Sequence, residues 1–366
     1  MNFFRNFAVQ SLRQPPIVKI RTLILLTAIV CAISAKAISF DLDSIAAMGR
    51  FPRFCVDTYR WGDKFFNGYD TTYVDGTGYK FNLKLRTDSW TDYYNLHFDN
   101  GTEMSMISEP STSVGFYLTY MALSVGYDMN VSKYFNGGEE ARKSWNFGFN
   151  CMLFSAKFYF VSNDVGTHIS TLHPYGGDTS HPDVLFKGVN NTNWGFDLLY
   201  FLSHKRYSHA AAFNFSRLQN KSGGSFFLGF SFNRIKYDFD FNQLPADILA
   251  TLPTDIPDNH YIVNAHNYVF PIGYGYNWAF ARHWLLGASV TVMPGWSNGY
   301  YKEADTEKTV FTTLAKNELS IVWNNRHWFA GLIGDVRLNM VRDDRRSMLS
   351  SVLNLEVSLG YRFNLW

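Results

Sequence analysis

Hydrophobic and polar residues alternate along much of the chain, and the longest clear example lies near its end. From Leu353 to Leu365 every odd position is apolar, whereas the even positions carry Asn354, Glu356, Ser358, Gly360, Arg362 and Asn364. A period of two is that of a β-strand with one apolar and one polar face. A tilted strand needs roughly 9–11 residues to cross a bilayer, and this segment exceeds that length. The pattern therefore predicts a membrane-spanning strand.

The same alternation recurs upstream, in segments that we predict to be strands. They are 79–85, 114–122, 125–131, 145–153, 194–202, 207–215, 226–241, 268–280, 284–292, 319–323 and 328–340. The apolar parity changes at Leu123–Ser124 and again after Phe232, and such a change indicates a bulge or a tight turn. We predict an all-β fold, a transmembrane antiparallel up-and-down β-barrel of about twelve strands, with ten or fourteen as alternatives.

The connections between these segments fall into two classes. Two short ones, 281–284 and 324–328, share an Arg-His-Trp sequence and are typical of periplasmic turns with an interfacial tryptophan. The connections at 130–142, 163–193, 242–266 and 294–308 are long and polar, as extracellular loops are. Counting strands back from Leu365 places Ser203–Arg206 outside, although it resembles a short periplasmic turn. At least one strand before residue 266 must therefore be misassigned.

Residues 1–37 have the features of a cleaved export signal. Arg5, Arg13, Lys19 and Arg21 precede a short apolar stretch, and Ala35-Lys36-Ala37 is a small-x-small cleavage site. The apolar stretch is shorter than the roughly 20 residues of a transmembrane helix. We expect residues 38–76 to form a periplasmic lead-in and residues 77–366 to form the barrel.

Composition and charge agree with an exported barrel. Aromatic residues make up 18% of the chain, yet the mean hydropathy is only −0.15, because lipid-facing and lumen-facing side chains alternate in barrel strands. Without the signal, 28 basic and 31 acidic residues remain, a formal charge of −3, so nothing supports nucleic-acid binding. Cys55 and Cys151 have neither the number nor the spacing of a metal site or a disulfide framework. We expect no cofactor.

One motif carries a family resemblance. The run W-G-D-K-F-F-N-G-Y-D-T-T-Y-V begins at Trp61 and leads into the first clear strand, and the similarity continues from Gly78 to Trp90 and through the last strand. The chain resembles a family of exported Gram-negative barrels catalogued as a domain of unknown function, number 4421 in that series. The resemblance implies an outer-membrane barrel, and it implies no known activity.

The histidines offer two candidate chemistries, and neither is supported by a motif. His168, His173 and His181 share a loop with Asp178 and Asp183, but their spacing fits no metal-site pattern, which favours ordinary polar loop histidines. A lipid-acting hydrolase or acyltransferase would need a serine and a histidine together. The histidines within alternating stretches are His97, in a weaker stretch at 94–98, and His209. Both are read with the parity of lipid-facing positions, and the available serines are Ser105, Ser124 and Ser208. No G-x-S-x-G run accompanies them, so we assign no catalytic residue.

Charged residues at lumen-facing positions form the most specific cluster. The first and last strands of a closed barrel are neighbours, so their charged residues should meet on one sector of the wall. We predict that seven residues line the lumen there: Lys80, Lys84, Arg86, Asp335, Arg337, Glu356 and Arg362. They can form either a polar pore lining or a paired ionic network that plugs the lumen.

The function remains open among three classes. We expect a passive channel or ligand-admitting barrel, with a lipid-acting enzyme and a plugged structural or partner-binding barrel as alternatives. Expected partners are outer-membrane lipid, a small solute or lipid ligand, and the barrel-assembly machinery. That machinery would recognise Tyr361, Phe363 and Trp366, although Trp366 has the opposite parity to the other two.

Overall fold

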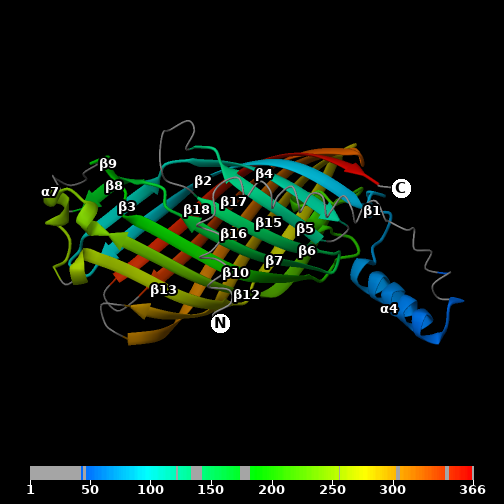
Figure 1. Cartoon of the computed structure of the whole chain (residues 1–366), viewed down its shortest axis with the longest axis horizontal. Coiled ribbons are helices and arrows are strands. Elements are labelled where there is room, and N and C mark those ends of the chain that lie inside the picture. The colour runs from blue at the N-terminus through cyan, green and yellow to red at the C-terminus, as the bar shows by residue number, and fades with distance from the viewer. Residues whose placement is uncertain are drawn as a thin grey trace, which may run out of the picture. The chain divides into compact units, whose positions relative to one another are not determined.

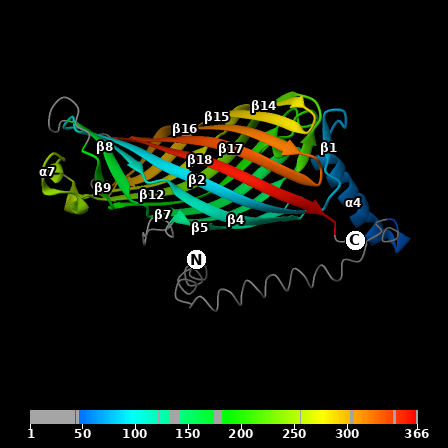
Figure 2. The ribbon, with the colours of Figure 1, turned by 90° about the horizontal axis from the view of Figure 1, so that it is seen from above.

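A closed antiparallel barrel of twelve strands dominates the computed structural model (Figures 1 and 2). The structure describes Asp43 and residues 47–120, 123–132, 142–173, 182–254, 256–301, 306–342 and 346–364. The predicted all-β barrel of about twelve strands is confirmed. The predicted signal at 1–37 lies outside the described residues.

The barrel strands follow one another around the wall in chain order. They are β2 (Phe81–Phe98), β4 (Ser111–Tyr120), β5 (Leu123–Asn130), β6 (Lys143–Asn150), β7 (Phe154–Asn163), β10 (Val189–Phe201), β12 (Gly223–Asp240), β13 (His260–Val269) with β14 (Ile272–Ala281), β15 (Trp284–Tyr301), β16 (Thr306–Asn324), β17 (Trp328–Arg342) and β18 (Arg346–Phe363). β13 and β14 form one strand, since both pair with β12 and β15 on either side of Pro271. The barrel closes where β2 pairs with β18 along its whole length, from Phe81↔Phe363 to Phe98↔Arg346.

Shorter elements decorate the two ends. β3 (Glu103–Ser108), β8 (Thr167–His173) and β9 (Val184–Phe186) extend the sheet beyond β2, and η1 (Phe241–Gln243), α7 (Ala246–Leu249) and η2 (Pro257–Asn259) lie between β12 and β13. α4 (Arg50–Asn67) and β1 (Val74–Gly76) precede the barrel, whereas α6 (His209–Phe213) and β11 (Arg217–Gln219) connect β10 to β12. No helix in the described part of the chain combines the length and the apolar composition needed to cross a membrane.

The turns distinguish the two ends. Between β4 and β5, β6 and β7, β14 and β15, and β16 and β17 the connections are short, and all lie at the end that carries Phe81 and Phe363. We call this the inner end, because short turns of such barrels are periplasmic, and the opposite end the outer end. The predicted turns around His283 and Arg326 lie at the inner end, where both residues adopt positive φ.

The strand predicted at 207–215 is wrong. Residues 209–213 form α6, whose N-cap Ser208 accepts a hydrogen bond from the amide of Ala211 through its side-chain oxygen. The alternation was misleading because Ala210, Ala211 and Ala212 are all buried, so the helix has no polar face to mark its period. With this strand removed, the Ser203–Arg206 turn lies at the inner end, which resolves the inconsistency in the strand count.

The change of parity after Phe232 is not a bulge. β12 pairs with β10 in one unbroken register from Phe227 to Phe239. Its outward face carries Phe226, Leu228, Phe230 and Phe232 towards the inner end, then Arg234, Lys236, Asp238 and Asp240. Its inward face carries Ser225, Phe227 and Ser231 towards the inner end, and then only apolar or aromatic residues at Ile235, Tyr237 and Phe239. The strand therefore leaves the membrane near Phe232. The earlier change, at Leu123–Ser124, is a tight turn, as β4 ends at Tyr120 and β5 begins at Leu123.

Beyond this boundary the strands enclose a core like that of a soluble protein, which we call the outer core. β3 and β8 pair with each other here, and their inward side chains join those of β2, β12, β13 and the α7 segment. Its buried members are Tyr94, Leu96, Phe98, Met104, Met106, Ile169, Leu172, Phe186, Val189, Ile235, Tyr237, Phe239, Phe241, Leu244, Ile248, Leu252, Ile256, Tyr261, Val263, Ala265, Val341 and Met348. The outer end of the barrel is thus filled by apolar side chains.

An arginine scan along one face of β10 tests the position of the membrane boundary. Leu198 and Asn190 both point outward, on opposite sides of Trp194. Leu198→Arg should lower the free energy of unfolding in phospholipid vesicles by about 2–4 kcal/mol, because a cation then sits in hydrocarbon. Asn190→Arg, the matched control, should change it by about 0.5 kcal/mol or less, because it lies in water. Equal losses in the two variants would contradict this boundary.

Candidate ligand cavity

The inner end is filled by the connection between β10 and β12, which folds back into the barrel. We call residues 207–219 the inner plug. Ala211, Ala212 and Phe215 of the plug pack against Leu285, Val322, Phe329 and Ile333 of the wall. The segment before the barrel also contacts the plug, because β1 pairs with β11. The backbone carbonyl of Tyr73 accepts hydrogen bonds from the amide of Asn220 at 2.7 Å and from Nε2 of Gln219 at 3.4 Å.

Arg362 of β18 fixes the plug to the wall. Its guanidinium donates to the carbonyl of Phe215, to Oδ1 of Asn324 at 2.9 Å and to the carbonyl of Arg326 at 2.7 Å. It also stacks over the ring of Phe329, 4.4 Å from the ring centroid. The side chain is almost fully buried, so its charge depends on these acceptors in place of water.

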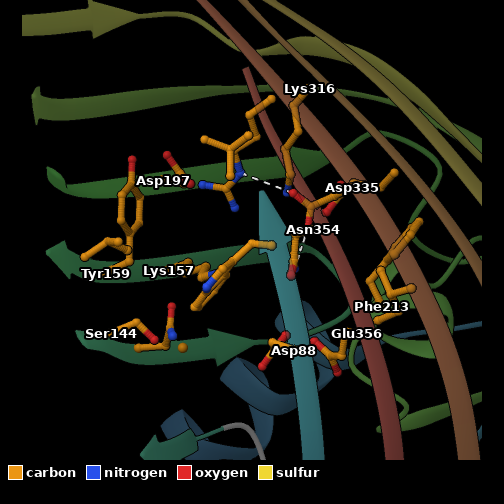
Figure 3. Close-up of a pocket in the computed structure, with 18 of the residues that line it drawn as sticks. Asp88, Ser144, Lys157, Tyr159, Asp197, Phe213, Lys316, Asp335, Asn354 and Glu356 are labelled. Carbon is orange, nitrogen blue, oxygen red and sulfur yellow. Dashed lines mark hydrogen bonds and ion pairs between the residues drawn. The ribbon is translucent and has the colours of Figure 1, made fainter. Parts of the chain in front are cut away.

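A polar cavity of about 290 Å³ lies between the outer core and the inner plug. Six cationic side chains line it, Lys84, Arg86, Arg142, Lys157, Lys316 and Arg337, together with six carboxylates, Asp88, Asp92, Asp197, Glu318, Asp335 and Glu356. Figure 3 shows Lys157, Tyr159 and Asp197 reaching into it from one wall, and Lys316 and Asp335 from the other. The volume is at the small end of ligand-binding sites.

Arg86 is the centre of one ionic network on the β2 side of the cavity. Its guanidinium lies 2.5 Å from Asp88, 2.7 Å from Asp128 and 3.4 Å from Glu356. Lys84 lies 3.3 Å from Glu356. Tyr117 donates its hydroxyl to Asp128 at 2.5 Å, and Ser358 donates to Glu356 at 2.5 Å. These carboxylates compensate the two buried cations.

A second network lies on β16 and β17. Lys316 is 2.5 Å from Glu318, Arg337 is 3.6 Å from Asp335, and Asn354 donates to Asp335 at 3.0 Å. A third contact joins Arg142 to Asp92 at 3.4 Å, with the guanidinium 3.5 Å from the ring centroid of Trp90. Asp197 accepts a hydrogen bond from Ser231 at 2.6 Å.

Within the described residues, Lys157 has no hydrogen-bond or ion-pair partner.

The lumen residues predicted from the sequence take different places. Lys84, Arg86 and Glu356 meet in the first network, and Asp335 and Arg337 pair in the second. Arg362 holds the inner plug and does not line the cavity, and Lys80 is exposed just before β2 begins. Sequence reasoning missed Lys157, Lys316, Glu318 and Asp197. The inward parity of β7, β10 and β16 was the signal that could have identified them.

The histidines lie away from this cavity, apart from His209. His97 is exposed on the outer end, between Ser347 and Glu103 on neighbouring strands, and in the described structure it makes no hydrogen bond or ion pair. His168 lies 3.1 Å from Asp183 and 3.6 Å from Glu109. His181 and Asp178 lie outside the described residues. No group of three His, Cys, Asp or Glu side chains among the described residues could hold a metal ion.

His209 differs from its predicted lipid-facing position because it lies on α6 inside the barrel. It packs against Phe201, with ring centroids 5.0 Å apart, and against Phe213 at 4.7 Å. Burial lowers the pKa of its imidazole to about 4. The ring is therefore neutral at neutral pH, as its apolar neighbours require.

Aromatic side chains form two girdles around the outside of the wall. At the outer boundary Trp194 contacts Phe158 and Phe232, and Tyr127 contacts Trp145. At the inner end the predicted assembly residues Tyr361 and Phe363 contact each other, Tyr361 also contacts Trp328, and Phe363 stacks on Phe81. Trp366 lies outside the described residues. Such girdles mark the two interfaces of a bilayer.

The barrel is closed, and its outer surface has an apolar belt between aromatic girdles. A charged cavity lies inside, between the outer core and the inner plug. These features define a transmembrane β-barrel protein. The chain belongs to the family described as "Domain of unknown function (DUF4421)", which matches residues 68–363. The resemblance seen in the sequence is confirmed. No curated protein matches the chain.

The chain is similar to solved structures of outer-membrane proteins at low sequence identity. The outer membrane protease OmpT from Escherichia coli is 7% identical, with a TM-score of 0.35, and the match covers 77% of this chain and 96% of that one. The translocator domain of the autotransporter NalP from Neisseria meningitidis is 12% identical, with a TM-score of 0.36, over 77% and 88% of the two chains. The P. putida toluene transporter TodX is 10% identical, with a TM-score of 0.28, over 78% and 90%. This likeness concerns the fold alone.

Glu356 should be a major contributor to barrel stability. Glu356→Gln removes the charge shared by Lys84 and Arg86, and breaking a buried pair in this way should lower the free energy of unfolding by about 3 kcal/mol. Urea unfolding in vesicles measures it. Glu103→Gln, at an exposed carboxylate on the outer end, is the control and should have little effect. An equally small loss at Glu356 would show that solvent screens the network.

Arg362 should hold the inner plug closed. Arg362→Met keeps the length of the side chain but removes its hydrogen bonds to Phe215, Asn324 and Arg326. We expect faster hydrogen exchange in residues 207–219 and larger single-channel conductance in planar bilayers. Arg337→Met, in the cavity but not in contact with the plug, should leave exchange in that segment unchanged. Unaltered hydrogen exchange of residues 207–219 in Arg362→Met would show that Arg362 does not hold the inner plug closed.

Proposed function

We propose that this protein is an outer-membrane barrel that admits a small anionic or zwitterionic solute into its central cavity, and that it is not an open pore at rest. The observation that carries the proposal is Lys157, whose ammonium group faces the cavity without a partner among the described residues. An export signal at residues 1–37, Gram-negative outer-membrane residence and insertion through Tyr361 and Phe363 belong to the same proposal.

The surroundings of Lys157 favour an anion. The cationic side chains of Lys316, Arg337 and Arg86 line the same cavity as its ammonium group. A cation held among other cations away from bulk water is unfavourable unless an anion or water compensates it. A carboxylate or phosphate group between Lys157, Lys316 and Arg337 would supply that compensation.

The carboxylates on the same walls limit the choice of solute. Asp197 lies on β10 and Asp335 on β17, so a bound molecule with an ammonium group finds acceptors close to the cationic site. Six cations and six carboxylates around one small cavity suit an amino acid or a dicarboxylate better than an apolar molecule. This distinguishes the proposal from a channel for hydrophobic compounds.

The outer core and the inner plug differ in the number of buried residues, and this difference suggests which end of the barrel opens to admit the solute. Among the described residues the outer core joins 22 buried side chains, whereas the plug takes part in a cluster of seven around Phe215 and a cluster of three around Tyr207. Elements with few buried apolar contacts open at lower free energy. We infer that the inner plug is the movable element and that the cavity exchanges its contents with the periplasmic side when the plug loosens.

Solute binding by the full-length protein tests the proposal. Succinate and glutamate are the probes, and calorimetry in detergent micelles measures their affinity. Lys157→Met should weaken binding about tenfold or more, since it removes a charge-assisted contact worth roughly 1.5–3 kcal/mol. Lys236→Met is the control, because Lys236 is exposed on the outer end.

Two results would count against the proposal. Equal affinity in Lys157→Met and wild type would place the solute elsewhere. A steady, large conductance of the wild-type protein in planar bilayers would show an open pore. We do not expect one, because the outer core and the inner plug fill the two ends of the barrel. No binding of either probe, together with no conductance even in Arg362→Met, would favour the plugged structural barrel.

A further inference from the structure

α4 carries an aromatic face that the described residues leave uncovered. Phe51 is 76% exposed, Phe54 66%, Trp61 63% and Phe65 52%. At 100° per residue these four positions fall within one side of the helix, whereas Arg53, Arg60, Asp63 and Lys64 fall on the other. The helix has four basic and two acidic residues, so it is amphipathic and carries a net positive charge.

A chain of ring contacts joins this face to the lipid-facing wall of the barrel. Trp61 stacks on Phe65 with centroids 5.4 Å apart, and Phe65 meets Phe66 at 5.1 Å. Phe66 then meets Phe154 at 5.7 Å, and Phe154 stacks on Phe149 of β6 at 5.4 Å. The amide of Leu153 donates to the carbonyl of Phe66 at 3.1 Å, which fixes the end of the helix at the inner rim.

Phe149 belongs to the outward face of β6, next to the exposed Phe147 and Trp145. These residues lie on the surface that meets hydrocarbon. Trp61 and Phe65, at the C-terminal end of α4, are therefore joined through ring contacts to the lipid-facing surface of the barrel. An amphipathic helix with aromatic residues on one face and basic residues on the other is the type that lies in a bilayer interface.

We propose that α4 binds the surface of the inner, phospholipid leaflet of the same membrane. Its aromatic face enters the boundary between headgroups and acyl chains, and Arg50, Arg53 and Lys64 meet lipid phosphates. The helix then anchors the segment that leads through β1 to the inner plug. This proposal does not depend on the solute-binding function, because it concerns the outer surface and not the cavity.

Site-specific fluorescence on the full-length protein tests this placement. All three native cysteines are replaced by serine, and single cysteines are introduced as Phe65→Cys or, on the opposite face, Asp63→Cys. Each is labelled with an environment-sensitive dye in vesicles of phosphatidylethanolamine and phosphatidylglycerol. Heat-modifiable migration on a gel verifies that each variant is folded. Phe51→Cys provides a second probe of the aromatic face, one that leaves the ring contacts at the rim intact.

At positions 65 and 51 we expect blue-shifted emission and loss of fluorescence with spin-labelled lipid. At position 63 we expect quenching by iodide in water instead. Quenching by iodide at all three positions would overturn the proposal, because the helix would then be in solution. Protection from iodide at 65 and 51 without quenching by spin-labelled lipid would also overturn it, since a second copy or another protein would then cover the face.

Discussion

The pairing of β2 with β18 is the constraint on which the rest of the structure depends. In a bilayer no water is present to satisfy free backbone groups, so a membrane sheet must close on itself. Here the ladder runs without interruption from Phe81↔Phe363 to Phe98↔Arg346. The same closure places Lys84 3.3 Å from Glu356, 272 residues away in sequence. The same strand pairing therefore closes the barrel wall and brings the buried cations to their carboxylate partners.

The strands continue past the membrane, and they meet two different environments along one backbone. On β12 the outward face is apolar at Phe226 and Leu228 and charged at Lys236 and Asp238, while the register with β10 does not change. Each half of the strand places its apolar side chains away from water, against lipid in one half and against the outer core in the other. The outer core forms where the strands extend past the membrane, and it closes the outer end of the barrel. The cavity is therefore limited on this side by the extended part of the strands.

Between the outer core and the inner plug, charge takes the place of apolar packing. Most of the ionic groups compensate one another at 2.5–3.6 Å, as Arg86 does with Asp88 and Asp128. A fully paired network would only fill space. The proposed solute site rests on Lys157, which has no such partner in the part of the chain that the structure describes. The inner plug has fewer buried apolar residues around it than the outer core. Its polar contacts to the wall come from Arg362, Asn324 and Asn277. The proposed opening at the inner end rests on this difference between the two ends.

By itself, the sequence determined the membrane barrel, its approximate strand number and the side on which Lys84, Arg86 and Glu356 lie. Side chains alternate strictly along a strand, so parity alone assigns a face to each residue. It could not tell that the apolar face of β12 turns from lipid to the outer core, since the same alternation describes both. Nor could it separate α6 from a strand, because Ala210, Ala211 and Ala212 are all buried inside the barrel and so leave no helical period in the sequence. Only tertiary structure decided that Arg362 contacts the plug and that Lys157 has no ion-pair partner among the described residues, because both depend on which strands face each other across the lumen.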